Sequence, residues 1–151
     1  MKLTPATQAI LWGGLCAGTL DLTAAYVTNL SRGVTLVHIL HSIASGWLGA
    51  ASFRGGYKTA ALGLVSHFLI ATGAATVYWF ASRKLPWLVE HTYLSGVAYG
   101  VAVYWFMQLV VLPLSAITFK PNHSWSVVVT GMLVHILCVG LPITLCAKRF
   151  V

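Results

Sequence analysis

Long apolar runs that carry almost no charge constrain the fold of this chain more than any other feature. Residues 57–82 (YKTAALGLVSHFLIATGAATVYWFAS) contain one charge, Lys58, and the basic pair at 83–84 follows directly. An α-helix needs about 20 apolar residues to cross the hydrocarbon core of a bilayer. This run is long enough, so it predicts a transmembrane helix.

The remaining apolar runs extend the same interpretation to the whole chain. We expect an all-α, polytopic integral membrane helical bundle in one domain over residues 1–151, with four spanning helices and one short amphipathic or re-entrant helix. The short segment, 34–52, has three possible placements: across the membrane, re-entrant, or flat in the interface. The predicted helices cover about 6–28, 34–52, 57–82, 92–118 and 124–147.

Charge supports a membrane protein and argues against a nucleic-acid partner. Only 7% of residues are charged, against about 25% in ordinary soluble domains. The net charge is +7. The lysines and arginines stand singly or in pairs beside the apolar runs, where they would anchor loops near lipid headgroups. We therefore expect the lipid bilayer, and no nucleic acid, as partner.

The candidate site takes one polar side chain from the interior of each predicted helix. Ionisable residues are costly inside a membrane and are functional candidates by default. Histidine titrates near neutral pH, and a nearby carboxylate stabilises its charged form, so such a set could pass protons. The same side chains could instead form structural hydrogen bonds between helices. The predicted polar membrane-core site consists of Asp21, His41, His67, Gln108 and His135.

Two glycine pairs indicate close helix packing. Gly14 and Gly18 form one G-x-x-x-G step, and Gly96 and Gly100 form another. Such steps let helix backbones approach closely in apolar segments. They predict packing against a second copy of the chain or against another membrane protein.

Catalytic and metal-binding motifs are missing from the sequence. There is no H-E-x-x-H, no G-x-S-x-G and no phosphate-binding loop, so an enzyme is not supported. Cys16, Cys138 and Cys146 lack zinc-site spacing, and no metal site is expected. No cofactor is predicted, with one alternative: His67 and His135 lie at similar depth and could supply both axial ligands of a b-type haem.

From His67 onward the chain resembles the YagU-like family of small bacterial inner-membrane proteins. The similarity rests on His67 in SHFLIATGAATVY, Pro86, the helix ending LVVLPL, Trp125 and His135. Some family members carry a histidine where this chain has Gln108. The resemblance implies the bacterial inner membrane, an association with acid resistance, and no cofactor.

Together these features favour one function and leave two alternatives open. The leading hypothesis is a proton-linked permease or channel subunit with a role in acid stress. In it, Asp21, His67 and His135 would line an inner polar site, and Gln108 would orient a water or solute. The alternatives are a structural or assembly subunit of a membrane complex, and a b-type haem protein.

Overall fold

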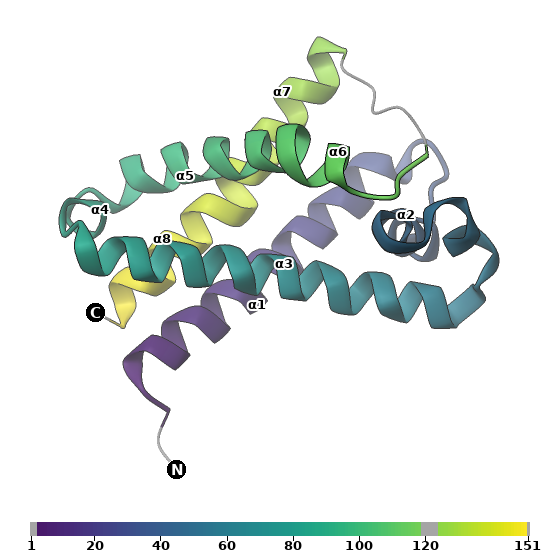
Figure 1. The fold of residues 1–151 in the computed structure, drawn as a ribbon. Coiled ribbons are helices and arrows are strands. Elements are labelled where there is room, and N and C mark those ends of the chain that lie inside the picture. The colour runs from purple at the N-terminus through teal and green to yellow at the C-terminus, as the bar shows by residue number, and fades with distance from the viewer. Residues whose placement is uncertain (1–2, 119–123, 151) are drawn as a thin grey trace.

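A computed structural model describes residues 3–118 and 124–150, and over these residues the chain is helical without a strand (Figure 1). The all-α prediction is confirmed. Five continuous helical stretches are long and apolar enough to cross a membrane: Pro5–Leu30, Leu36–Arg54, Gly56–Lys84, Thr92–Leu114 and Trp125–Arg149. Their elements are α1 (Pro5–Leu30), α2 (Leu36–Leu48), the 3-10 helix η1 (Gly49–Arg54), α3 (Gly56–Lys84), α4 (Trp87–Glu90), α5 (Thr92–Phe106), the π-helix η2 (Met107–Val111), α6 (Leu112–Leu114), α7 (Trp125–Val134), the π-helix η3 (His135–Gly140) and α8 (Leu141–Arg149).

Helix bounds follow local capping chemistry. The Thr4 hydroxyl accepts a hydrogen bond from the Thr7 backbone N–H at 3.2 Å, and Pro5 occupies the first turn of α1. Thr35 caps α2 in the same way, through the N–H of His38. The fourth long helix ends at Leu114, not near 118 as expected, because Ser115 turns to an extended conformation after Pro113. Residues 115–118 of the predicted helix are therefore non-helical.

Helices α1 and α3 pack antiparallel through small residues. Gly14 faces Thr72, and a Cβ on Gly14 would lie 2.7 Å from the Cα of Thr72. Four residues further along α1, Gly18 faces Phe68. The numbering rises on one helix as it falls on the other, so α1 ends at the end of the bundle where α3 begins. Helix α2, which connects them, must therefore begin and end at that same end.

The second glycine pair joins α5 to the last helix. Gly96 faces Leu141 and Gly100 faces Ile136, again with opposite directions. The closest approach is at Gly140, where an added Cβ would lie 2.6 Å from the Gly100 backbone nitrogen. Both G-x-x-x-G pairs are thus used inside one chain, whereas we had assigned them to contacts with a partner.

These pairings give the bundle two distinct ends (Figure 1). We call one the termini end, because Pro5, Lys84, Thr92 and Arg149 lie there. We call the other the α2 end, because α2 lies there with Leu30, Gly56, Leu114 and Trp125. The four helices α1, α3, α5–α6 and α7–α8 run alternately between the two ends, and α2 crosses α3 at one of them.

Helix α2 buries polar side chains together with the apolar Ile39, Leu40 and Ala44, and it also exposes large apolar side chains. His41 places Nε2 2.8 Å from the carbonyl oxygen of Gly56, and Ser45 is 1% exposed. On the opposite side Leu36 and Trp47 are exposed, Trp47 by 71%. Large apolar side chains on the outer surface suit an apolar solvent.

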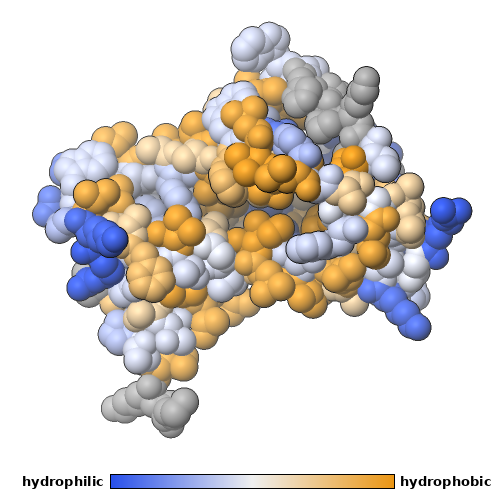
Figure 2. All heavy atoms as spheres, in the orientation of Figure 1, coloured by the Kyte–Doolittle hydropathy of each residue, from blue (hydrophilic) through white to orange (hydrophobic). Residues whose placement is uncertain are grey.

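The surface of the whole molecule follows the same rule. Figure 2 shows apolar residues over the middle of the bundle and strongly hydrophilic residues gathered at its two ends. Soluble proteins rarely expose continuous apolar patches above a few hundred Å². The buried core is built mainly from small residues and two aromatic ones: Ala9, Ala17, Ala75, Tyr78, Trp79, Val139, Ile143 and Ala147.

Candidate functional site

A cavity of about 870 Å³ lies between the helices, toward the α2 end. Side chains from α1, α2, α3, α5, η2 and η3 line it, so it exists only when all the long helices are assembled. Most of the lining is apolar. The polar side chains that reach it are Asp21, Asn29, His38, Ser42, His67, Gln108, Thr118 and His135.

The cavity brings together four of the five residues predicted from the sequence. Asp21, His67, Gln108 and His135 line it, each from a different helix. His41 does not, because its ring turns to the Gly56 carbonyl at the start of α3.

Four polar residues at the cavity were not predicted as part of the site: Asn29, His38, Ser42 and Thr118. His38 and Ser42 belong to the polar face that the sequence of the short segment revealed, but we chose His41 from that face. Asn29 lies eight residues after Asp21 on α1, which brings it back to the same face. The predicted helix ended at residue 28 and left Asn29 in the turn that follows, whereas α1 continues to Leu30. Helical spacing from Asp21 was the signal that could have found it.

His67 is held in one orientation by the backbone of α1. Its Nε2 lies 2.8 Å from the carbonyl oxygen of Gly18. A carbonyl oxygen can only accept, so Nε2 carries the hydrogen and donates it. In the neutral ring, Nδ1 is then the acceptor. The neighbouring Phe68 ring packs edge-on against the imidazole at 5.6 Å.

His135 is oriented in the opposite sense. Its Nδ1 lies 2.9 Å from the carbonyl oxygen of Gly131, one turn earlier on the same helix. The nitrogen Nδ1 therefore donates, and Nε2 remains as the acceptor of the neutral ring. The Tyr104 ring stands edge-on to the imidazole at 5.4 Å.

Two π-helices set the positions of Gln108 and His135. In each, the next backbone N–H bonds five residues back: Leu112 to Met107, and Leu141 to Ile136. A proline follows each π-helix by two residues, at 113 and 142. Proline lacks an N–H and crowds the carbonyl four residues earlier, which loosens the preceding turn. Such bulges often mark functional sites, and here both carry cavity residues.

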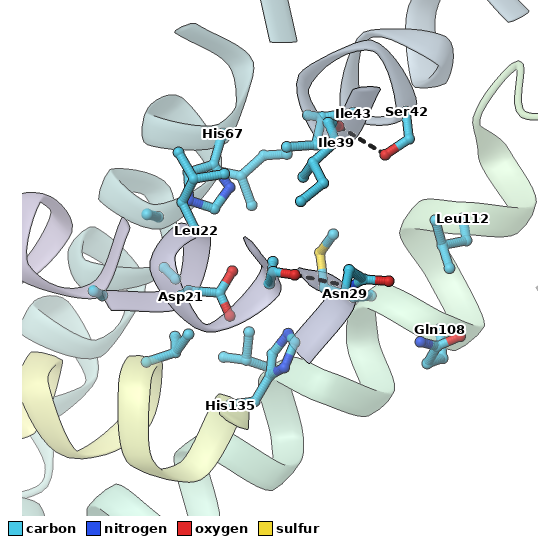
Figure 3. A pocket seen from close by; sticks show the side chains of 18 of the residues that line it. Asp21, Leu22, Asn29, Ile39, Ser42, Ile43, His67, Gln108, Leu112 and His135 are labelled. Carbon is cyan, nitrogen blue, oxygen red and sulfur yellow. Dashed lines mark hydrogen bonds between the residues drawn. The ribbon is translucent and has the colours of Figure 1, made fainter. Parts of the chain in front are cut away.

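Asp21 lies between the two histidines. In Figure 3 its carboxylate points into the space that His67 and His135 border from opposite sides. The carboxylate makes no hydrogen bond or ion pair with residues 3–118 or 124–150. An unpaired charge in a dry interior is costly. The carboxylate must therefore take a proton, water or another polar species from the cavity.

Gln108 lies apart from this group, beside Leu112 at the far side of the cavity (Figure 3). Its side-chain oxygen is buried and has no hydrogen-bond partner in the described part of the chain. Buried polar atoms without partners are rare and call for an explanation. A water molecule or solute in the cavity would satisfy this atom.

The histidines fit a haem poorly. For haem, two imidazole nitrogens would have to face one iron. The Nε2 atom of His67 already donates to Gly18, so coordination through that nitrogen would break the hydrogen bond.

We expect the detergent-purified protein to be colourless. The absorption spectrum, taken oxidised and then reduced, should lack a Soret band, because Nε2 of His67 already donates to the Gly18 carbonyl and would have to give up this hydrogen bond to ligate iron. Haem added to the purified protein should produce no such band either. A Soret band that disappears in His67→Ala and His135→Ala would make this chain a haem protein instead.

Comparisons of this chain with protein-family models, with curated proteins and with solved structures find no match. The resemblance to the YagU-like family therefore stays a prediction from the sequence. The functional argument rests on the cavity and the side chains that line it.

Proposed function

We propose that this chain is a small integral membrane protein that carries protons, alone or with a small polar solute, through the cavity at Asp21, His67 and His135. One observation carries the proposal. An unpaired carboxylate and two imidazoles, each with one nitrogen left as an acceptor, border the same buried space. A carboxylate oxygen and an imidazole acceptor nitrogen can each bind a proton, so the three side chains can pass one between them.

The proposed membrane arrangement has four crossings. Helices α1, α3, α5–α6 and α7–α8 alternate in direction, and each is long enough to span. Because α2 begins and ends at the α2 end, it re-enters the membrane from that side without crossing. Basic residues near the ends of the long helices, such as Arg54 and Lys58 at one end and Lys84 and Arg149 at the other, would lie among the headgroups.

The proposed proton path uses the geometry of the three side chains. A proton enters on the Asp21 carboxylate and passes through cavity water to Nδ1 of His67 or Nε2 of His135. The opposite nitrogen of each ring keeps its hydrogen bond to a backbone carbonyl, so each imidazole becomes a cation without losing its orientation. The Gln108 amide would hold a water or solute at the far side.

The proposed setting is the bacterial inner membrane under acid stress. This part of the proposal comes from the resemblance to the YagU-like family. Histidine pairs favour it physically, since imidazoles gain protons as the pH falls below neutral. The flux should therefore rise on acidification.

Proton flux into liposomes that contain the purified protein tests the proposal. We expect the unmodified protein to dissipate an imposed pH gradient, and faster at acid pH. His67→Ala and His135→Ala should reduce the rate to that of empty liposomes, because each removes one proton acceptor from the cavity.

His91→Ala is the matched control, since His91 is exposed and stacks on Trp87 outside the cavity. It should retain full flux. Size-exclusion profiles of all variants report folding. Flux that persists in well-folded His67→Ala and His135→Ala would refute the proposal, and loss of folding in both would assign the histidines a structural role.

A further inference from the structure

A second cavity, of about 580 Å³, adjoins the first between α1 and α7. We propose that this cavity is the water-filled entrance to the Asp21 site, and that it admits water from the α2 end only. The inference rests on the proposed function, because it assigns that site a route and a side. It identifies Asp21 and His135 as the junction between entrance and inner cavity.

The two cavities share the side chains at their boundary. Asp21, Ala25, Asn29 and His135 line both of them. A species that moves from the second cavity into the first must therefore pass between the first long helix and the last. The carboxylate and the imidazole stand at this passage, where they can exchange a proton with whatever enters.

The walls of the second cavity are polar on both helices. On α1 the lining residues recur at 21, 25, 28 and 29, which is one helical face that carries Asp21, Thr28 and Asn29, and Arg32 adds to this wall from the turn after the helix. On α7 the facing residues include Ser126 and Thr130. The Thr28 hydroxyl and the Asn29 amide nitrogen each donate a hydrogen bond to the backbone of α1. Their remaining hydrogen-bonding capacity, together with the Asp21 carboxylate, is costly to leave facing hydrocarbon. Water filling the space between the two polar faces removes this cost.

The opposite half of the bundle is closed. Ala17 and Val139 line the inner cavity, and both belong to the buried core cluster. Beyond them toward the termini end, Gly13 packs against Ala75, with 3.3 Å between an added Cβ and the Ala75 Cβ. Ile143 on the last helix is only 1% exposed. Close packing of these residues leaves the α2 end as the open side.

Labelling of introduced cysteines with a charged, membrane-impermeant thiol reagent tests the entrance. The background chain carries alanine in place of Cys16, Cys138 and Cys146 and is reconstituted in liposomes. Ala25→Cys and Thr130→Cys place a thiol at the second cavity, each on a different helix. Ser31→Cys and Lys148→Cys mark the α2 end and the termini end.

Matched controls lie on the outer surface of the same helices. Val27 is 61% exposed and Val129 is 44% exposed, and neither lines a cavity. Both lie nearer the α2 end of their helix than the corresponding cavity position. If depth alone decided labelling, Val27→Cys and Val129→Cys would therefore react faster.

We expect Ala25→Cys and Thr130→Cys to react more than about tenfold faster than their controls, since the reactive thiolate forms only in water. The reaction should occur from the side that labels Ser31→Cys. Equal rates at cavity and control positions would overturn the inference, as would labelling from the side of Lys148→Cys. Labelling needs no transport. If it succeeds while the liposomes show no flux, the entrance stands and the proposed function fails.

Discussion

Replacing Gly140 by alanine should cost this protein about 3 kcal/mol of folding free energy, at the upper end of the usual effect of overpacking. A Cβ at this position would collide with the carbonyl oxygen of Gly96 and lie 2.8 Å from the Cα of Gly100. These neighbours are backbone atoms, which cannot move aside as a flexible side chain can. The helices α5 and η3 would have to separate along their whole contact. Thermal unfolding in detergent, followed by circular dichroism, measures the loss.

Gly73→Ala is the control for this change. A Cβ on Gly73 meets nothing within 4 Å, although Gly73 also lies within a long helix. Alanine favours a helix over glycine by about 1 kcal/mol, so this variant should be as stable as the parent or slightly more stable. If both substitutions lowered the stability equally, the loss at Gly140 could not be assigned to its close backbone contact with Gly96 and Gly100, and the prediction would be wrong.

Replacing Gly63 by leucine should detach α2 from the bundle and leave the other helices assembled. A Cβ on Gly63 would collide with the carbonyl oxygen of Leu40 and lie 2.8 Å from the Leu40 carbonyl carbon. A leucine side chain therefore cannot fit between α2 and α3. The contacts of α1 with α3 and of α5 with α8 involve other residues, so the main unfolding transition should persist.

Thiol reactivity in detergent reports this local change. Ser45 on α2 is 1% exposed, so Ser45→Cys should be protected in a background with alanine at the three native cysteines, and should react readily once Gly63→Leu is added. Gly73→Leu, also on α3 but with open space around it, should leave the thiol protected. A protected thiol in the Gly63→Leu protein would mean that α2 tolerates the added side chain.

The sequence predicted the helices well and the site in large part. The length of each apolar run predicts where a helix occurs. An ionisable residue inside a run identifies the face of the helix that packs toward the inside of the bundle. This logic identified Asp21, His67 and His135, which line one cavity. It could not choose between His38 and His41, which lie three residues apart on one face of α2. The angle at which α2 crosses α3 decides that His41 meets Gly56 while His38 reaches the cavity.

Other features depend on contacts between distant segments and carry no local signature. A G-x-x-x-G step predicts a close helix neighbour but does not say which one, and both pairs here meet helices of the same chain. A proline such as Pro113 loosens the helical turn before it, but the sequence could not show that this turn would take the π form. Nor could it show that Pro142 would do the same around His135.

The helices that line the cavity also determine at which stage of protein synthesis it can form. Asp21 lies on α1 and His135 on η3, which are the first and last long helices of the bundle, and Gly13 packs against Ile143 on α8. Contacts between residues so far apart in sequence form late, because a long loop must close first. A nascent chain that has inserted α1 to α5 holds the carboxylate but lacks the wall that completes its polar chamber. If the chain carries protons as proposed, the path is complete only after the last long helix has joined the bundle.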